Sequence, residues 1–222
     1  MSGGDGRHVS DPLAVLQRIR TTRPRPVAPP EERCEVCSEP IGGEHCHLVD
    51  LKARNLMCAC RGCYLLFTSA GSGGSHYRAV PQRYVAFSDL ELSSAKWESL
   101  QIPVGIAFFF VNSSIGRVAA FYPGPAGATE SELPMDTWDD VFGTSETLQT
   151  LEPDVEALLV RARSARRDAD STRDETEYFI VPIDACYELV GRLRQLWRGF
   201  DGGSDAHRAM DEFFDRVRAR AR

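Results

Sequence analysis

The spacing of the cysteines constrains the fold of this chain more than any other feature. Six of its seven cysteines lie between positions 34 and 63, in the pattern Cys34-x2-Cys37, Cys46, Cys58-x-Cys60-x2-Cys63. A Cys-x2-Cys turn directs two sulfur atoms at one point, and two such turns complete a tetrahedral metal site. The 22 residues between Cys37 and Cys60 are close to the spacing of zinc ribbons. We therefore predict a Cys-rich metal-binding module over residues 31–70.

The predicted metal ligands are the thiolates of Cys34, Cys37, Cys60 and Cys63, with Cys58 and His47 as reserve ligands. The reserve is needed because either Cys58 or Cys60 can join Cys63, and His45 and His47 flank Cys46. A structural zinc ion is the first interpretation, since about forty residues with few apolar side chains have little else to fold around. Iron is the alternative, as a rubredoxin-like centre or a cluster, because the segment has more thiolates than one zinc ion requires.

The segments around the cysteines predict a zinc-ribbon or treble-clef-like arrangement. Residues 47–51 and 56–58 are apolar runs that can pair as a hairpin, and residues 61–67 can begin a helix packed beneath the metal site. The module is preceded by residues 1–30, which we interpret as a mobile Pro/Arg-rich arm with one short helix after Ser10. A Gly/Ser spacer over residues 70–75 follows the module.

Residues 76–222 predict an α+β domain with a mostly antiparallel sheet. The expected strands are 77–87, broken by Pro81, a hairpin of 104–111 with 118–122, and 178–181. The expected helices are 92–100, a turn at 136–141, a helix opened by Pro153 with an Arg-rich end, 184–197, and one from about 205. The segments 123–131 and 168–176 are expected to be loops.

Composition and motifs narrow the classes of function. No apolar run reaches the roughly 20 residues of a membrane-spanning helix, and the N-terminus lacks the apolar region of a signal peptide, so a cytoplasmic protein is expected. No nucleophile-elbow or zinc-protease motif indicates catalysis, and Cys186 lies on an apolar helical stripe, which favours a buried thiol over a nucleophile. The sequence therefore favours a non-catalytic protein.

The distribution of charge bears on the partner. The net charge of −6 argues against a protein that mainly holds nucleic-acid backbone. A zinc-ribbon regulator that binds nucleic acid through the basic arm is an alternative, but residues 31–70 carry four basic and six acidic side chains, a net charge of −2. Residues 123–160 carry nine acidic and no basic side chains, so they are a candidate docking surface for a protein partner.

Several motifs together resemble a known family. They are the two cysteine turns with His47, Tyr77-Arg78-Ala79-Val80-Pro81, Gln101-Ile102-Pro103-Val104-Gly105, Phe121-Tyr122-Pro123-x-Pro125-Ala126-Gly127 and Val181-Pro182-Ile183-Asp184-Ala185-Cys186. Over roughly residues 31–220 the chain resembles an uncharacterised bacterial domain family encoded beside high-affinity uptake [NiFe]-hydrogenases. In that family pattern, the cysteine turns and His47 belong to the motif more firmly than Cys46 does.

The resemblance implies an accessory protein of hydrogenase assembly or maturation, with a hydrogenase subunit or a maturation factor as its partner. Two mechanisms stay open under it. Either the cysteines hold a structural zinc ion and the protein is a binding scaffold, or they hold iron and the protein transfers electrons to or from a hydrogenase.

Overall fold

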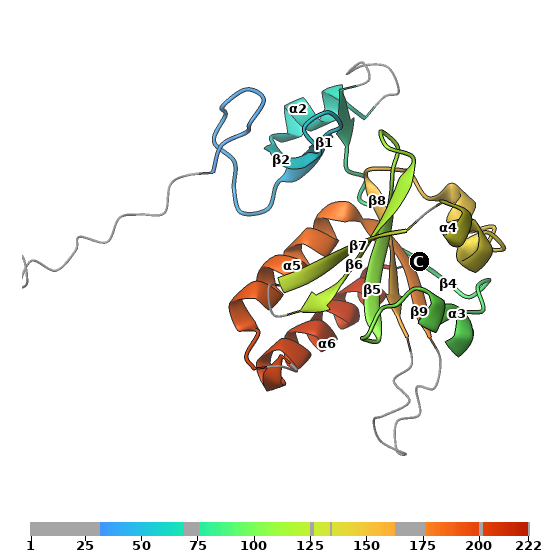
Figure 1. Ribbon diagram of the computed structural model, residues 1–222. Coiled ribbons are helices and arrows are strands. Elements are labelled where there is room, and N and C mark those ends of the chain that lie inside the picture. The colour runs from blue at the N-terminus through green and yellow to red at the C-terminus, as the bar shows by residue number, and fades with distance from the viewer. Residues whose placement is uncertain are drawn as a thin grey trace, which may run out of the picture.

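The computed structural model describes residues 32–68, 76–124, 127–133, 135–162, 176–199 and 202–221. These residues form two antiparallel sheets, a small one of three strands and a large one of six strands. The arm over residues 1–30, the spacer and most of the loop expected at 168–176 lie outside the described residues. The predicted fold class is confirmed, because the described chain combines a Cys-rich small sheet with an antiparallel sheet covered by helices (Figure 1).

The small sheet is built around the predicted hairpin. Strands β1 (Cys46–Asp50) and β2 (Asn55–Ala59) pair antiparallel, and the short helix α2 (Arg61–Leu66) follows directly. Strand β3 (Tyr77–Ala79), from beyond the spacer, pairs with the other edge of β1. The main-chain hydrogen bonds of β3 therefore join the next part of the chain to the cysteine-bearing hairpin.

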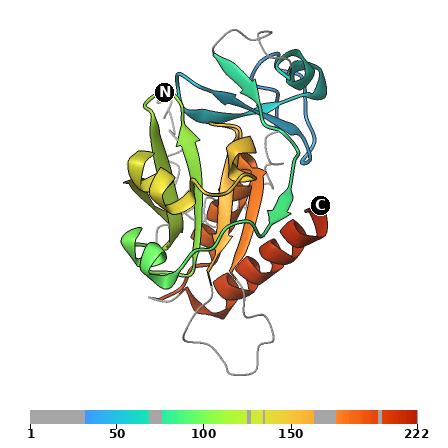
Figure 2. The ribbon, with the colours of Figure 1, turned by 90° about the vertical axis from the view of Figure 1, so that its right-hand side faces the viewer.

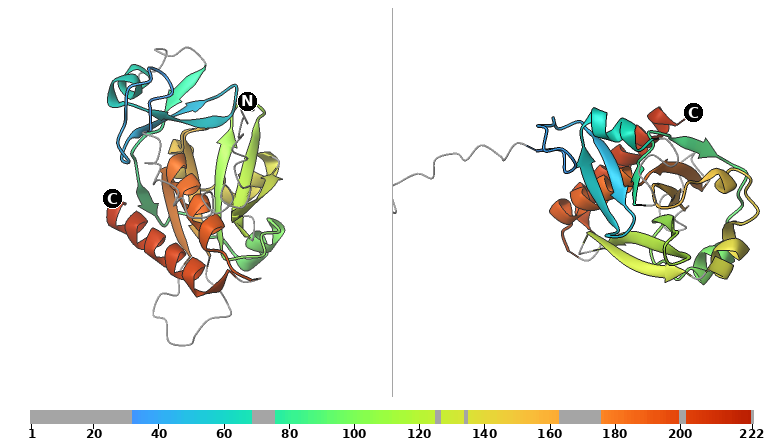
Figure 3. Two further views of the ribbon diagram at one scale, coloured as in Figure 1. Left: turned by 90° about the vertical axis from the view of Figure 1, so that its left-hand side faces the viewer. Right: turned by 90° about the horizontal axis from the view of Figure 1, so that it is seen from above.

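The large sheet has the strand order β4-β9-β8-β5-β6-β7, and every neighbouring pair is antiparallel. Its strands are β4 (Val85–Phe87), β5 (Ile106–Asn112), β6 (Arg117–Gly124), β7 (Gly127–Leu133), β8 (Glu156–Arg161) and β9 (Glu177–Pro182). Helices α5 (Ile183–Leu196) and α6 (Gly203–Arg220) cover one face, as Figure 3 shows from the left-hand side of Figure 1. Helices α3 (Ser94–Ser99) and α4 (Met135–Phe142) and the 3-10 turn η1 (Leu148–Thr150) lie on the other face.

Alternation of side chains along the central strands produces two cores. Phe109, Leu158 and Ile180 point into the core beneath α4, whereas Phe108 and Leu159 point into the core beneath α5 and α6. Successive residues of a strand face opposite sides of the sheet, so strands buried on both faces are apolar throughout. None of the helices that the structure describes is long and apolar enough to cross a membrane.

The prediction of a helix after Pro153 is wrong, because residues 156–161 form the central strand β8. Val155, Leu158 and Leu159 match a helical stripe, but the intervening residues Glu156, Ala157 and Val160 are buried as well. A continuous buried run of this length is typical of a strand covered on both faces. Arg163, Arg166 and Arg167, expected in the last turns of that helix, lie outside the described residues.

The prediction of an irregular loop over residues 123–131 is also wrong, because β6 continues to Gly124 and β7 begins at Gly127. The two strands pair from Val118 with Leu133 to Gly124 with Gly127. Strand β7 is the last strand of the sheet, and its sequence GATESEL has little of the apolar alternation that identifies a strand. Main-chain pairing with β6, which the sequence pattern does not reveal, holds it in place.

The small sheet sits at one end of the large sheet, as Figures 2 and 3 show from opposite sides. A shared apolar cluster joins them, formed by Val49, Val80, Val155 and Ile183. Polar contacts add to it, because the guanidinium of Arg78 donates to the carbonyl of Pro153 over 2.8 Å. The position of the cysteine-bearing hairpin is therefore defined relative to the start of α5.

Candidate metal centre

The first cysteine turn is shaped by its own backbone. The amide of Ser38 donates to the carbonyl of Cys34 over 2.8 Å, and Ser38 adopts a left-handed φ of 64° that reverses the chain. The amide of Glu35 donates to the carbonyl of Cys58, while the Glu35 carboxylate accepts from the amide of Cys58 over 2.6 Å. This two-way contact holds the first turn against strand β2.

The second cysteine turn lies between β2 and α2. Cys60 is the N-cap of α2, and its sulfur accepts a hydrogen bond from the amide of Cys63 at 3.4 Å. The sulfur of Cys60 therefore accepts the hydrogen bond that the oxygen of an N-cap serine would accept. The first turn of the helix holds Cys63 on the same side as Cys60. This is the geometry that a Cys-x2-Cys turn needs to direct both sulfurs at one metal ion.

The two turns converge on a common point. One ligand atom from each of Cys34, Cys37, Cys60 and Cys63 lies within 4.8 Å of the other three. The Sγ atoms of Cys37 and Cys60 are 3.7 Å apart. A tetrahedral zinc ion with zinc–sulfur bonds of about 2.3 Å requires sulfur–sulfur separations of about 3.8 Å. The four cysteines predicted as ligands are therefore together, and the separation of Cys37 and Cys60 suits a tetrahedral metal ion.

The pKa values of Cys34 and Cys63 are shifted in opposite directions. Burial raises the pKa of Cys34, but backbone N–H groups of Cys60, Cys37 and Val36 oppose it and the pKa falls to about 6. Burial and the neighbouring thiols raise the pKa of Cys63 well above its ordinary value. Thiolates packed this closely repel one another, so a bound cation would allow all four to ionise together.

The reserve ligands lie in a second group. Cys58 and His47 join His45, and one ligand atom from each residue lies within 4.8 Å of the other two. Cys46 belongs to neither group. It points away from His47, to the side of β1 where it packs with Cys34 and Cys63, and its sulfur lies 4.0 Å from the Arg61 guanidinium. Cys37 is exposed, whereas Cys34 is 1% exposed, so the four-cysteine group opens to solvent on one side.

A comparison with known protein families matches the part of the chain that holds the cysteine turns and the large sheet. The model of a family of unknown function, DUF5947, matches residues 33–221, which include both cysteine turns and the large sheet. The chain belongs to the DUF5947 family. Comparisons of this DUF5947 chain with curated proteins and with solved structures gave no significant match.

One contact near the cysteines of the DUF5947 chain had no signal in the sequence. The Nδ1 atom of His47 lies 2.8 Å from a carboxylate oxygen of Asp184, which is 137 positions further along the chain, in the first turn of α5. Only the docking of the small sheet against α5 brings the two residues together. His45 and His47 did share a local signal, because they are only two residues apart in the sequence, although β1 begins at Cys46.

Cys186 belongs to neither group. Its side chain is fully buried in the core under α5 and α6, next to Leu189 and Phe214. Burial raises the pKa of this thiol far above its ordinary value, which disfavours the nucleophilic thiolate. Its position is that of a small core residue.

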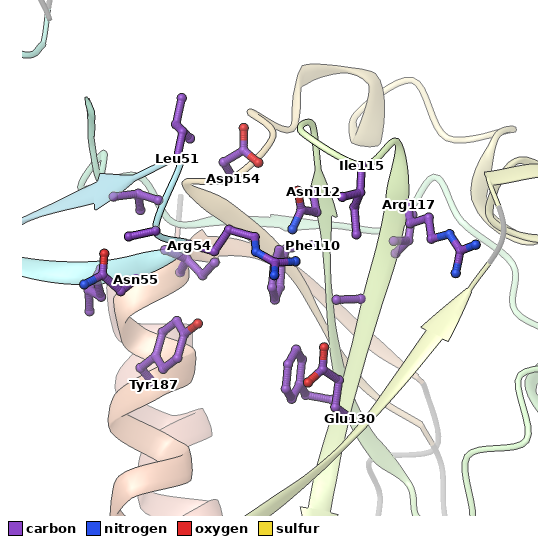
Figure 4. Close-up of a pocket in the computed structure, with 17 residues that line it drawn as sticks. Leu51, Arg54, Asn55, Phe110, Asn112, Ile115, Arg117, Glu130, Asp154 and Tyr187 are labelled. Carbon is purple, nitrogen blue, oxygen red and sulfur yellow. The ribbon is translucent and has the colours of Figure 1, made fainter. Parts of the chain in front are cut away.

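A pocket of about 340 Å³ lies between the β1–β2 hairpin and the large sheet, beside the contact that joins them. Leu51, Arg54 and Asn55 line it from the β1–β2 side, and Phe110 and Tyr187 line it from β5 and α5 (Figure 4). Its wall is mixed, with stacked rings of Phe110 and Phe121 beside the charged groups of Arg54 and Glu130. None of the four clustered cysteines lines this pocket.

Proposed function

We propose that the chain is a non-catalytic metal-binding accessory protein of [NiFe]-hydrogenase assembly or maturation, with a structural zinc ion held by Cys34, Cys37, Cys60 and Cys63. The observation that carries the metal-binding part is the convergence of four sulfurs from two separate turns. Four protein ligands fill a tetrahedral zinc ion, and such closed sites are structural rather than catalytic.

The need for a structural ion follows from the size of the core around the cysteines. Its buried members are Cys34, Leu48, Ala59, Cys63 and Tyr64, so two of the five are themselves candidate ligands. A cluster this small buries too little apolar surface to hold a hairpin, a helix and a cysteine turn together. A metal ion bonded to both turns would supply the missing stabilisation.

The hydrogenase part of the proposal is supported by the motifs that resemble the hydrogenase-linked family, all of which lie within the matched residues 33–221.

The acidic residues of 123–160 are the candidate docking surface for a protein partner. Asp154 and Glu156 are buried and paired with arginines, so they are structural. Glu130, Asp136 and Glu146 are exposed and remain candidates for contact with a basic partner surface.

The proposal is tested on the protein purified from a host that expresses a [NiFe]-hydrogenase, with its metal content, visible spectrum and co-purifying subunits measured together. We expect zinc, no visible absorption band, and a hydrogenase subunit or maturation factor retained on the tagged chain. Thiolate-to-iron charge-transfer bands would contradict a structural zinc ion. They would favour the alternative, an iron-binding protein that transfers electrons to or from a hydrogenase.

The matched controls separate metal binding from partner binding. Cys37→Ser removes a member of the four-cysteine group and should lower both zinc content and retention of the partner, whereas Cys46→Ser should change neither. A zinc-loaded protein that retains no hydrogenase component would contradict the accessory role and leave the metal site standing.

A further inference from the structure

One face of the β1–β2 hairpin carries a second group of metal-ligating side chains. His47 on β1 lies directly opposite Cys58 on β2, and His45 precedes His47 by two residues. Residues opposite each other on paired strands project to the same face, and His45 lies immediately before the start of β1. The three side chains consequently meet, with the His45 and His47 rings 4.8 Å apart between centroids.

Both imidazole rings are oriented by oxygen acceptors. Nδ1 of His45 lies 2.9 Å from the carbonyl oxygen of Gly42, and Nδ1 of His47 lies 2.8 Å from the carboxylate of Asp184. Carbonyl and carboxylate oxygens only accept, so each Nδ1 carries a hydrogen and Nε2 is the nitrogen that each ring can offer to a metal ion. Metal-bound histidines are held in this way, by an oxygen acceptor on the nitrogen that does not bind the metal.

The Nε2 atom of His45 supplies an independent observation. Among the residues that the structure describes, it is the one buried side-chain nitrogen or oxygen with no hydrogen-bond partner. The His45 side chain is only 10% exposed. A buried polar atom without a partner costs about 1–3 kcal/mol, so native structures seldom retain one without a reason. A metal ion bound to this lone pair would supply the missing partner.

The charges around the group favour a cation. The Glu35 carboxylate accepts from the amide of Cys58, a carboxylate oxygen of Glu32 lies 3.5 Å from Nδ1 of His45, and Asp184 contacts His47. The nearby guanidinium of Arg61 is placed beside Cys46 on the other face of β1 and over the ring of Tyr64. Three carboxylates therefore surround the two imidazoles and the thiol.

We propose that His45, His47 and Cys58 form a second metal site, separate from the four-cysteine site, which binds a divalent transition metal and leaves one coordination position open to an exogenous ligand. Two imidazoles and one thiolate suit zinc and its neighbours in the first transition series. Three protein ligands are the number found where a metal ion keeps an exchangeable position.

The geometry needs only a small closure. A tetrahedral ion with bonds of about 2.0–2.3 Å to nitrogen and sulfur places its ligand atoms about 3.3–3.6 Å apart. One ring nitrogen of each histidine and the Cys58 sulfur lie within 4.8 Å of one another, so side-chain displacements of about 1 Å would bring three ligand atoms to these separations. The proposal does not depend on the hydrogenase role.

The experiment is a titration of the reduced, metal-free full-length chain with Co²⁺, followed through its thiolate charge-transfer and d–d absorption bands. We expect two equivalents to bind. His45→Ala and Cys58→Ser should each abolish the second equivalent and retain the first, and Cys37→Ser should weaken the first. Cys46→Ser, which removes a thiol that belongs to neither group, should retain both.

Asp184→Asn gives a readout that does not require loss of a ligand. The amide leaves His47 in place but weakens the interaction that orients its ring, so the affinity of the second equivalent should fall about 10–100-fold with the stoichiometry unchanged. Retention of the first equivalent shows that the hairpin is folded in each variant. Binding of one equivalent by the unaltered chain, or two unchanged equivalents in both His45→Ala and Cys58→Ser, would overturn the proposal.

Discussion

Removing the metal with a chelator is expected to abolish amide protection across β1, β2 and α2 while the large sheet keeps its protection. The core of the small sheet is too limited to persist alone, whereas the large sheet has a full core on each face. Zinc binding contributes about 10–16 kcal/mol to the folding of small cysteine-rich modules. Hydrogen exchange measured by mass spectrometry on the full chain, before and after chelation under reducing conditions, reports both regions at once.

A variant provides the matched control for this experiment. Cys37→Ser, examined without chelator, should reproduce the loss of protection because it removes one of the four sulfurs. Strand β3 pairs with β1 and should lose protection with it. Equal protection of the hairpin with and without metal would show that packing against α5, through Val49 and Ile183, is sufficient to fold it.

Arg83→Ala is expected to lower the free energy of unfolding by about 3–5 kcal/mol, because it leaves a buried carboxylate without its counter-ion. Glu156 is 0% exposed, and Arg83 donates to both of its carboxylate oxygens, over 2.8 and 2.7 Å. The same carboxylate accepts from the amide of Glu152, and Arg83 also donates to the carbonyl of Thr150. Urea denaturation at neutral pH measures the effect.

Two further variants show whether the cost comes from the uncompensated charge. Arg208→Ala removes an arginine from an exposed pair with Asp205 and should change the stability by less than about 1 kcal/mol. Replacing both members of the pair, as Arg83→Met with Glu156→Leu, should restore most of the lost stability, since the buried carboxylate is removed together with its partly exposed arginine. A loss below about 1 kcal/mol in Arg83→Ala would mean that water reaches the Glu156 carboxylate.

Local signals predicted much of this fold. The hairpin, α2 and the helices α5 and α6 follow from apolar periodicity within single segments, and the break at Pro81 does separate β3 from β4. The chain turns between α5 and α6 at Gly199, Gly202 and Gly203, all with positive φ, which the glycine-rich sequence indicates. The four cysteines converge because each turn needs only its own three-residue spacing and one hairpin between them.

The features that could not be predicted depend on contacts far apart in the chain. The register of β7 depends on β6, and β8 can be distinguished from a helix only once both faces of its sheet are covered. The contact of His47 with Asp184 depends on how the small sheet docks against α5. Single-segment patterns carry no information on such contacts. Spacing alone allows either Cys58 or Cys60 to join Cys63, so the sequence leaves Cys58 and His47 as reserve ligands of the first site.

Zinc-edge X-ray absorption of the zinc-loaded chain shows whether the four clustered cysteines hold a metal ion. The variant with both His45→Ala and Cys58→Ser is the sample to use, because it leaves only the four-cysteine group. We predict a single shell of four sulfur atoms at about 2.3 Å from the zinc ion. A shell dominated by nitrogen or oxygen, or a spectrum unchanged by adding Cys37→Ser, would contradict it.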